Sequence, residues 1–284
     1  ECNPDDCSLE NLREWKQLGV NRLSIGIQSF NDDQLKWMNR SHRASDSLNA
    51  VRNAQQIGFQ ELSLDLMYGL PGMDLQEWRQ QLDQIIRLNP EHISAYCLTV
   101  EQRTALAKWV SDGTITVSSN EAQSEQFEEL VAALDRAGYE QYEISNFARN
   151  GHYSTHNTAY WKGAKYVGIG PSAHGYDQKE RYWNQANNRV YMRELENGNL
   201  PETRELLSAY DRFNEIVMVG LRTKWGVSKE QLFGYLTPDG KWYQIVRDYE
   251  DQGLLVQTAD TLVLTPKGRL LADGIASDLF LMEN

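Results

Sequence analysis

The feature that most constrains the fold is a repeated order of amphipathic helix and alternating strand in the first half of the chain. Three such pairs follow one another, at 8–18 with 21–30, 48–57 with 62–66, and 74–89 with 92–100. The helices repeat apolar residues every three or four positions, and the strands alternate apolar with polar residues. Because parallel strands need crossover connections, usually helices, this order predicts an α/β fold with a parallel sheet.

Residues that favour helix ends mark the boundaries of these segments. Ser8 and Asp74 are predicted N-caps, because their side-chain oxygens can accept hydrogen bonds from backbone N–H groups of the first turn. Gly138 follows a fourth helical pattern at 127–134, where glycine commonly ends a helix. A fourth strand is therefore predicted at 141–145.

After Pro201 the pattern changes to several helices followed by two short strands. Predicted helices lie at 206–221, 227–236, 242–251 and after Pro266, and predicted strands lie at 254–257 and 261–264. Helices followed by a hairpin favour a small winged-helix-like α+β domain.

The charge and cysteine content restrict the partners and the compartment. The formal net charge is -12, and a field of this sign repels nucleic-acid backbones. No apolar run approaches the roughly 20 residues of a membrane-spanning helix. The three cysteines are too few and too unevenly spaced for a disulfide framework, which favours a reducing compartment. We therefore expect a cytoplasmic protein that binds small molecules or proteins, without nucleic acid and without a membrane span.

Two polar residues occupy the carboxyl ends of the first two predicted strands. Gln28 ends the strand at 21–30, and Asp65 lies at the end of the next one. In parallel α/β folds, the loops at the carboxyl ends of strands meet and bind ligands. A local hydrogen bond explains either residue alone equally well, but the two together favour a ligand site.

Short motifs along most of the chain point to a family. They are ECNP (1–4), GVNRLSIGIQSF (19–30), NR (39–40), DLMYGLPG (65–72), YEISNF (142–147), HNTAYW (156–161), GIG (168–170), AH (173–174), GLRT (220–223) and LTPKG (264–268). Each motif is common on its own, but their order and spacing are specific. Together they resemble the radical S-adenosylmethionine proteins of the oxygen-independent coproporphyrinogen III oxidase family.

This resemblance implies a partial parallel (β/α)6 barrel, in which S-adenosylmethionine lies across the strand ends beside a 4Fe–4S cluster. We expect residues 1–140 to form the remainder of this barrel, 141–205 a family-specific extension, and 206–284 the C-terminal winged-helix-like domain. We expect the barrel to be truncated at its N-terminus. Family members carry a further segment, with the first strands and the cluster loop, before the position that matches Glu1.

The resemblance also assigns positions that contact S-adenosylmethionine. Gln28 and Asp65 match positions that hold the ribose hydroxyls, and carboxylate and amide groups can satisfy a diol. Arg40 matches the position that binds the methionyl carboxylate, for which a guanidinium fork is well suited. Glu1 matches an acidic position near the methionyl end. Gly69 has no Cβ to keep a flat base away from the backbone.

Structural roles explain the same residues. Arg40 follows a short predicted helix, where a cation can hydrogen-bond the last carbonyls, and Asp65 could pair with a basic neighbour. Residues 68–72 would form a turn in any fold, because Pro and Gly favour turns. Both interpretations stay open from the sequence.

The cysteines depart from the family pattern, in which a CxxxCxxC motif binds the cluster. Cys2 and Cys7 are five positions apart and Cys97 falls in a predicted strand, so no trio matches the motif. We expect Cys2 and Cys97 to be small buried residues and Cys7 to be an ordinary thiol beside a helix start. The cluster would belong to the full-length protein only. This chain is expected to hold no metal ligands and no catalytic residue, and to be inactive in radical chemistry as given.

Two branches of the family differ in function. One is the coproporphyrinogen III dehydrogenase, an oxidoreductase that oxidatively decarboxylates propionate side chains to give protoporphyrinogen IX. The other is the haem chaperone, which binds haem and transfers it to acceptor proteins. The motif at 156–161 is more similar to the chaperone branch, as are residues 108–109 and 143–147. Haem or porphyrin, together with haem-acceptor proteins, are therefore the expected partners.

Flat side chains are dense in the part of the sequence that follows. They are His152, Tyr153, His156, Tyr160, Trp161, Tyr166, His174 and Tyr176. Such rings could sandwich a tetrapyrrole and offer an axial ligand. His156 is the favoured single candidate, and Tyr160 is assigned to haem with it. The rings could equally be packing residues, with the histidines in local hydrogen bonds.

Two other classes of function are disfavoured. A winged-helix domain could bind DNA, but residues 205–284 hold twelve Asp and Glu against eight Lys and Arg, the wrong sign for a phosphate-contacting surface. A barrel enzyme acting on a sugar or phosphate would explain Gln28 and Asp65, because fold does not determine function. That alternative leaves the ordered motifs unexplained.

Overall fold

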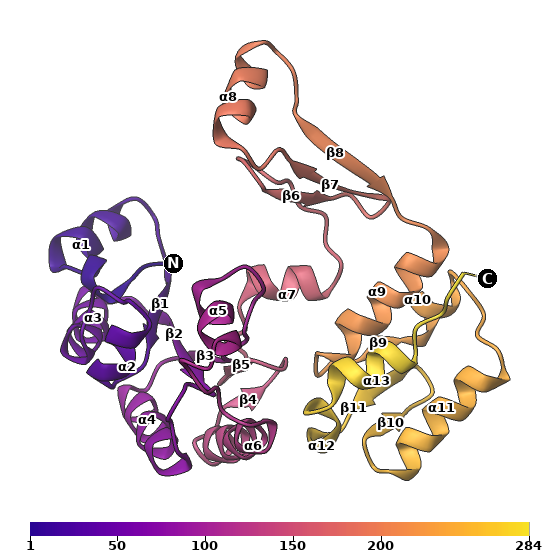
Figure 1. The fold of residues 1–284 in the computed structure, drawn as a ribbon, viewed down its shortest axis with the longest axis horizontal. Coiled ribbons are helices and arrows are strands. Elements are labelled where there is room, and N and C mark those ends of the chain that lie inside the picture. Colours follow the sequence, from indigo (N-terminus) through magenta and orange to yellow (C-terminus); the bar gives the residue numbers. More distant parts are fainter. Residues whose placement is uncertain (284) are drawn as a thin grey trace. The chain divides into compact units, whose positions relative to one another are not determined.

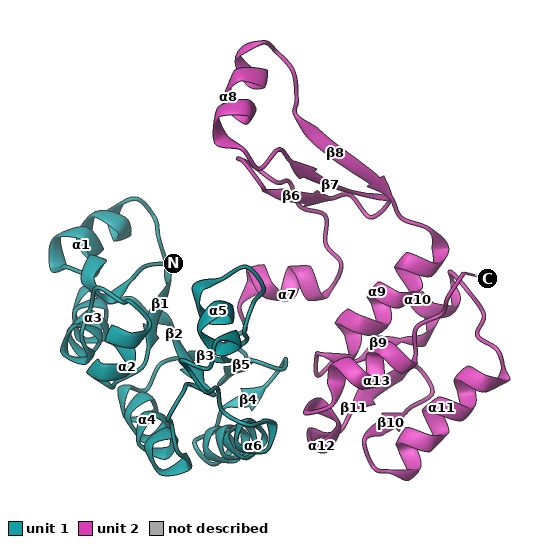
Figure 2. Ribbon diagram, in the orientation of Figure 1, with its two compact units in different colours: residues 1–153 teal, residues 154–284 magenta. Residues whose placement is uncertain are grey.

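The computed structural model describes residues 1–283, and the chain divides into two compact units, one of residues 1–153 and one from Ser154 onward (Figure 2). The three-part division expected from the sequence, with boundaries at residues 140 and 205, remains a prediction. Every helix within residues 1–283 is too short or too polar to span a membrane.

The first unit is built around a five-stranded sheet with the strand order β1-β2-β3-β5-β4 (Figure 1). Its strands are β1 (Arg22–Gln28), β2 (Glu61–Tyr68), β3 (His92–Cys97), β4 (Glu140–Gln141) and β5 (Asn146–Ala148). Its helices are η1 (Pro4–Asp6), α1 (Leu9–Gln17), α2 (Asp32–Trp37), α3 (Ala44–Ile57), α4 (Leu75–Leu88), α5 (Ala105–Ser111) and α6 (Asn120–Arg136). Strands β1, β2 and β3 pair in parallel, which confirms the expected α/β arrangement.

The helix ends lie where capping residues predict them. The hydroxyl of Ser8 accepts a hydrogen bond from the backbone N–H of Asn11 at 3.1 Å, at the start of α1. The carboxylate of Asp74 accepts one from the backbone N–H of Glu77 at 2.7 Å, at the start of α4. Gly138 has a φ of 82° just after α6, the left-handed conformation that ends many helices.

The predicted fourth strand at 141–145 is wrong. The chain makes a turn between β4 and β5, and β5 pairs antiparallel with both β3 and β4. The carboxylate of Glu143 accepts a hydrogen bond from the backbone N–H of Ser145 at 3.0 Å and another from the side chain of Asn146. These bonds stabilise the turn. Because β4 and β5 are only two and three residues long, neither shows a clear alternation in the sequence.

The two faces of the parallel strands differ in polarity. One face is apolar and buried, and its members are Leu23, Ile25, Ile27, Leu62, Leu64 and Leu66. Helices α3, α4 and α6 lie along this side of the sheet (Figure 1), and full burial of each such side chain contributes about 1.5–3 kcal/mol. The other face carries Ser24 and Gln28 on β1 and Asp65 on β2, all partly buried. Burial of the apolar face therefore orients the polar residues to the opposite side.

The second unit contains two three-stranded sheets, ordered β6-β7-β8 and β10-β11-β9. Its strands are β6 (His174–Tyr176), β7 (Glu180–Asn184), β8 (Glu202–Leu206), β9 (Val227–Ser228), β10 (Leu255–Gln257) and β11 (Thr261–Leu264). Its helices are α7 (Thr155–Trp161), α8 (Asn188–Glu196), α9 (Ala209–Leu221), α10 (Lys229–Phe233), α11 (Gly240–Asp251), α12 (Pro266–Arg269) and α13 (Ala272–Asp278). Figure 1 shows α8 and the β6-β7-β8 sheet apart from the helices around the other sheet.

The C-terminal part has the element order expected of a winged-helix-like domain, with helices followed by the hairpin of β10 and β11. Several helix boundaries differ from the prediction, and α10 ends at Phe233 while α11 begins at Gly240. Helix α9 begins at Ala209 instead of 206, because β8 extends to Leu206 and Ser208 caps α9 by accepting from the backbone N–H of Asp211 at 3.1 Å. The segment predicted as a helix from Val227 begins as strand β9, which pairs with β11.

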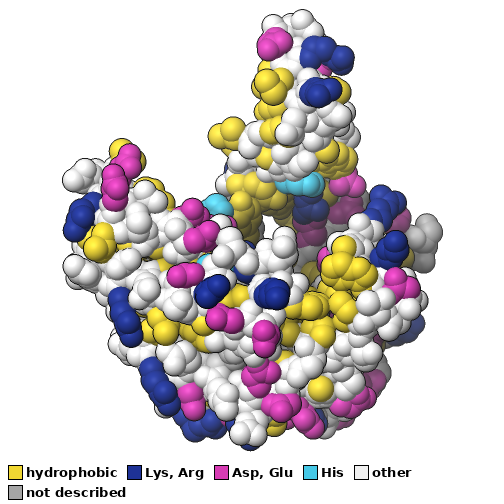
Figure 3. Space-filling view, turned by 60° about the vertical axis from the view of Figure 1, so that its left-hand side comes forward, with side chains coloured by type: hydrophobic (Ala, Val, Ile, Leu, Met, Phe, Trp, Pro, Cys, Tyr) yellow, Lys and Arg dark blue, Asp and Glu magenta, His cyan; other side chains and the backbone are white. Residues whose placement is uncertain are grey.

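Apolar side chains remain exposed in the part of the second unit around α8. Yellow side chains are visible on this projecting region in Figure 3. Exposed apolar residues of this region and the segments next to it are Val167, Ile169, Met192, Leu195, Leu200 and Leu206. Because these side chains stay exposed, they contribute no burial free energy to the folding of this unit.

Close backbone packing requires glycine at position 268. A Cβ on Gly268, in α12, would lie 1.9 Å from the carbonyl oxygen of Leu254. Among the described residues, no atom lies within 4 Å of the corresponding Cβ position on Gly274, in α13. The contact is therefore specific to the first glycine.

We expect Gly268→Ala to lower the free energy of unfolding by about 1–3 kcal/mol, the usual cost of overpacking a closed site. Gly274→Ala is the matched control and is expected to be neutral or to stabilise by up to ~1 kcal/mol, because alanine favours a helix over glycine. Urea unfolding followed by circular dichroism measures both. Equal stabilities of the two variants would contradict the close contact.

Candidate functional site

The polar face of the first unit brings together three side chains from neighbouring strands. Asp65 on β2 lies opposite Ser94 on β3 in the parallel register. The hydroxyl of Ser24 on β1 donates to the Asp65 carboxylate, at 3.3 Å from Oδ1 and 3.4 Å from Oδ2, and Ser94 also hydrogen-bonds Asp65. Sequence reasoning found Asp65 and missed both serines. The available signal was that each serine alternates with apolar residues on its own strand.

The environment of Asp65 favours its protonated form. Burial raises the pKa of this carboxyl to about 6, and the negative charge of Glu1 adds to the effect. The hydrogen bonds from Ser94 and Ser24 act in the opposite direction, because they stabilise the carboxylate. Desolvation is the largest of these effects. Asp65 is thus mostly ionised at neutral pH and is held as a hydrogen-bond acceptor.

Gln28 ends β1 in an unusual backbone conformation. Its φ is 63°, in the left-handed region that disfavours residues with a Cβ. The register between β1 and β2 shifts just before it, so that Gln28 lies opposite Leu66, the residue after Asp65. Its side chain folds back over Gly26, where a Cβ would lie 2.8 Å from Gln28 Nε2. The prediction that Gln28 ends its strand is therefore confirmed. Asp65, predicted at a strand end, lies inside β2, which continues to Tyr68 and pairs with β3 over that length.

Arg40 contacts the first residues of the chain, and these residues pair with β1. The Arg40 guanidinium donates to the side-chain oxygen of Asn3 at 3.4 Å. Cys2 runs beside β1, because its N–H donates to Ser24 O at 2.9 Å and its carbonyl accepts from Gly26 N at 3.1 Å. Glu1 precedes this contact and is exposed. The segment before η1 therefore connects the Arg40 side chain to the strand that carries Ser24.

Gly69 follows β2 with a φ of 71°. A Cβ on this residue would lie 3.1 Å from Cys97 Sγ and 3.3 Å from Gln123 Cγ. Its backbone N–H donates to the side-chain oxygen of Gln126 at 2.8 Å. The left-handed turn and these neighbours account for glycine here, and its contact with a cofactor base stays a prediction.

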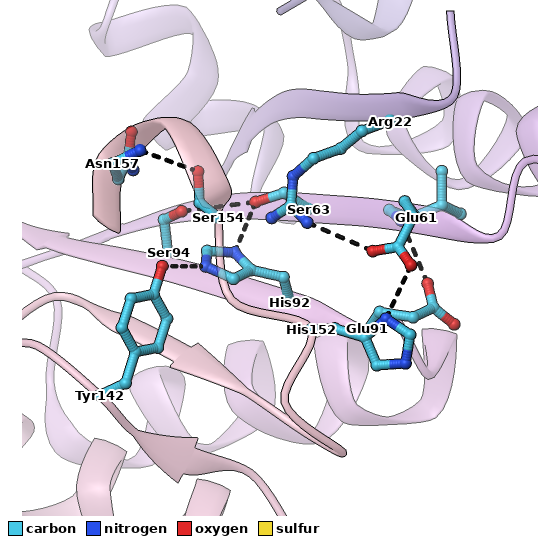
Figure 4. Close-up of polar contacts among 11 residues, drawn as sticks. Arg22, Glu61, Ser63, Glu91, His92, Ser94, Tyr142, His152, Ser154 and Asn157 are labelled. Carbon is cyan, nitrogen blue, oxygen red and sulfur yellow. Dashed lines mark hydrogen bonds and ion pairs between the residues drawn. The ribbon is translucent and has the colours of Figure 1, made fainter. Parts of the chain in front are cut away.

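A chain of buried polar side chains runs from Ser94, the neighbour of Asp65 on β3, into the interior of the unit. Figure 4 shows its members Ser94, Ser63, His92 and Tyr142. The hydroxyl oxygens of Ser94 and Ser63 are 3.5 Å apart. Ser63 Oγ lies 2.8 Å from His92 Nδ1, and His92 Nε2 lies 2.8 Å from the hydroxyl of Tyr142. Each of these polar groups therefore has a partner, although all four side chains of this interior part are buried.

His92 is neutral in this network. Burial, and to a lesser extent the charge of Arg22, lowers the pKa of His92 to about 3. A neutral imidazole donates from one nitrogen and accepts at the other, and hydroxyl groups can match either role. Figure 4 also shows Glu61, at the amino end of β2, in an ion pair with Arg22 (3.4 Å) and in a hydrogen bond with His152 (2.7 Å).

The cysteines are placed differently from the prediction. Cys7 is the buried one, 2% exposed, because it packs in the core of the unit, whereas Cys2 and Cys97 are only partly buried. Cys2 Sγ and Cys7 Sγ are 3.3 Å apart. Within residues 1–283, no group of three His, Cys, Asp or Glu residues is suited to hold a metal ion. The described residues thus do not fit a 4Fe–4S cluster.

The ring-bearing residues predicted to contact haem divide between the two units. His152 and Tyr153 belong to the first unit, where His152 pairs with Glu61. In the second unit, His156 and Tyr160 are exposed and lie four positions apart on α7, so that they share one face. Their ring centroids are 4.9 Å apart in an edge-to-face arrangement.

Further tyrosines extend this pair into a row of rings. The centroids of Tyr160 and Tyr166 are 4.7 Å apart, and those of Tyr166 and Tyr176 are 6.0 Å apart. His174 packs instead against Trp183, at 6.1 Å. Four of the predicted residues in this unit therefore form one continuous aromatic row.

The raised pKa of Asp65 predicts a pH dependence of stability. The folded chain binds this proton more tightly than the unfolded chain, whose Asp has an ordinary pKa near 3.8. Ionisation of Asp65 therefore destabilises the fold as the pH rises from about 4 to about 6, and the effect is complete above that range. We expect the stability of the unsubstituted chain to fall over this interval relative to Asp65→Asn, as measured by urea unfolding at each pH. Asp83→Asn, on the exposed side of α4, is the control, and a flat difference for Asp65→Asn would contradict the raised pKa.

Comparison with known proteins gives two family matches. Residues 1–85 match the radical SAM superfamily, and residues 207–271 match the HemN C-terminal domain. Among solved structures, coproporphyrinogen III oxidase (HemN) from Escherichia coli aligns with a TM-score of 0.80 and 20% identity, over 98% of this chain and 68% of that one. This likeness shows the fold, a partial barrel of the radical SAM type with a HemN-type C-terminal domain.

Curated relatives cover nearly the whole chain. The Heme chaperone HemW of Bacillus subtilis is 35% identical over 97% of this chain and 73% of its own length. The protein of the same name from Mycobacterium tuberculosis is 33% identical over 98% and 70%. The radical S-adenosyl methionine domain-containing protein 1 of Bos taurus, a mitochondrial protein, is 33% identical over 98% of this chain and 66% of its own length. The chain therefore belongs to the radical S-adenosylmethionine proteins, in the family of the HemW haem chaperones.

Proposed function

We propose that this protein is a haem chaperone, which binds haem and transfers it to acceptor proteins, and that its first unit binds S-adenosylmethionine. The observation that carries the haem proposal is the exposed His156 at the end of a row of tyrosine rings. Relatives that bear the name haem chaperone support it. The haem is the cargo of this function, and the acceptor proteins are part of the proposal.

The surroundings of the five histidines favour His156 as the haem ligand. His42 and His92 are buried and hydrogen-bonded, and His152 pairs with a carboxylate. His156 and His174 are exposed and have no hydrogen-bond partner within residues 1–283, and each packs against an aromatic ring. His156 is preferred because its neighbour Tyr160 continues into the row of Tyr166 and Tyr176. An imidazole without a partner is free to ligate iron.

The row of rings next to His156 suits a flat tetrapyrrole. Tyr160 is 42% exposed, so part of its ring faces solvent beside the imidazole. Aromatic side chains bury large apolar areas against flat ligands and prefer stacked or edge-to-face contacts. In this proposal His156 binds the iron while Tyr160 packs against the macrocycle.

The S-adenosylmethionine proposal rests on the polar face of the first unit. Asp65 accepts hydrogen bonds from Ser24 and Ser94, which orient its carboxylate, and a ribose diol offers further donors to the same oxygens. Gln28 lies at the neighbouring strand end. In this proposal Arg40 binds the methionyl carboxylate, and Glu1 lies near the same end of the cofactor.

The last contact proposed for S-adenosylmethionine is with its adenine base. Gly69 is assigned to the adenine base. When bound, S-adenosylmethionine supplies the 5′-deoxyadenosyl group that radical SAM proteins release by reduction. The described residues do not fit the reducing cluster, so the proposal gives this chain binding and orientation only.

The haem proposal predicts a spectroscopic difference between two histidine variants. Haem added to the purified chain should show a Soret band that is shifted and sharpened relative to free haem. His156→Ala should weaken haem binding by about tenfold or more, which corresponds to ~1.4 kcal/mol. His174→Ala is the control from the same unit and should bind as the unsubstituted chain does. An unchanged titration of His156→Ala would remove His156 as the ligand. A spectrum equal to that of free haem with every one of the proteins would refute haem binding.

Titration calorimetry with S-adenosylmethionine tests the second site. Asp65→Ala removes a charged acceptor, and a hydrogen bond to a charged group contributes about 1.5–3 kcal/mol, so affinity should fall about 10- to 100-fold. Asp83→Ala, on the exposed surface of α4, should leave affinity unchanged. Equal affinities of the two variants would contradict the assignment of Asp65 to the cofactor.

A further inference from the structure

Two of the three cysteines are in contact, although their spacing does not match the CxxxCxxC motif that binds a cluster. Cys2 Sγ lies 3.3 Å from Cys7 Sγ, and both thiols are free. The third cysteine, Cys97, lies at the end of β3, where its sulfur is near Gly69 and the backbone of Leu98. The chain therefore contains one close pair of thiols and a separate thiol that can serve as an internal comparison.

The backbone holds the two sulfurs together from both sides. Cys2 is bound to β1 through its N–H and its carbonyl group. The N–H of Cys7 donates to the carbonyl oxygen of Pro4 at 3.2 Å, and its own carbonyl accepts from the side chain of Asn53 on α3 at 3.1 Å. Only η1 lies between the two cysteines. The pair therefore stays close without closing a long loop. The sulfurs are 3.3 Å apart, compared with about 2.05 Å in a disulfide bond.

The two thiols differ in access and in charge. Cys2 is partly exposed, whereas Cys7 is 2% exposed. The hydrogen bond from the Cys7 thiol lowers the pKa of Cys2, because it stabilises the Cys2 thiolate, while the same bond raises the pKa of Cys7. A thiolate is the nucleophilic form of cysteine. Cys2 is thus suited to react first with an oxidant. Cys7 lies close enough to attack the oxidised Cys2 sulfur afterwards.

We propose that Cys2 and Cys7 form a redox-active dithiol, which a hydroperoxide converts reversibly into an intramolecular disulfide. In the first step the Cys2 sulfur attacks a peroxide oxygen, the O–O bond breaks, and the sulfur becomes a sulfenic acid while hydrogen peroxide releases one water. In the second step the Cys7 sulfur attacks the Cys2 sulfur, the S–O bond breaks, and the hydroxyl group leaves as water with the Cys7 proton. The two thiols lose two electrons, and the peroxide gains them.

The position of the pair gives the modification a local consequence. The segment that the disulfide closes contains Asn3, whose side-chain oxygen accepts from Arg40. It also adjoins Glu1 and the start of the contact with Ser24. The dithiol therefore lies beside the polar face of the first unit, but its chemistry is independent of which ligand that face binds.

Thiol counting on the reduced 284-residue chain tests the proposal. After treatment with hydrogen peroxide and denaturation, we expect two of the three thiols to be lost, together with two hydrogens from the intact mass and no cross-linked chains. Peptide mapping without reduction should show Cys2 joined to Cys7, and dithiothreitol should restore all three thiols. Cys97→Ser is the matched variant, and it should lose both of its thiols in the same way.

Cys7→Ser should form no intramolecular disulfide, and its oxidation at Cys2 should proceed to sulfinic acid, with two oxygens added to the mass. Circular dichroism checks that this variant is folded, and the mapping of the unsubstituted chain does not depend on it. Three remaining thiols, sulfinic acid at Cys2 in the unsubstituted chain, or a disulfide that includes Cys97 would each overturn the proposal.

Discussion

The parallel pairing of β1, β2 and β3 is the interaction on which the rest of the first unit depends. Its register places Ser63 between Ser24 and His92 and places Asp65 opposite Ser94, so that polar side chains of three strands share one face. A shift of one strand by one residue would turn its apolar side chains, such as Leu64, to the polar face. The same shift would turn polar side chains toward the helices. Hydrophobic burial therefore selects the register, and the register assembles the polar face.

Buried polar side chains on one face of a sheet are stable only if they form hydrogen bonds with one another. An unpaired buried donor or acceptor costs about 1–3 kcal/mol, a large share of the roughly 5–15 kcal/mol that separates a folded domain from its unfolded state. Ser63, His92 and Tyr142 avoid this cost because hydroxyl groups and a neutral imidazole can each donate and accept. The charge is confined to Asp65, which is only partly buried.

Local patterns in the sequence predicted the features that depend on neighbouring residues, namely the helix ends and the alternation of the strands. Helix ends follow from capping side chains. Asp65 was recognised because it alternates with apolar residues, although the strand continues past it to Tyr68. The roles of Ser24 and Ser94 were not predictable in this way, because they depend on which strands become neighbours across about 30 to 40 positions of sequence. The contact between Cys2 and Cys7 was missed for a related reason. It requires the first residues to pair with β1, which no periodic pattern in so short a segment reveals.

The backbone of Gln28 has a consequence for how this chain balances folding against recognition. A residue with a Cβ in the left-handed region costs about 1–2 kcal/mol that glycine would avoid. The strand end therefore keeps a side-chain amide at the expense of thermodynamic stability, a trade that is common where a surface is selected for contact with another molecule. A more thermostable form of this protein is accordingly accessible by a change at this position, and it would lack the amide.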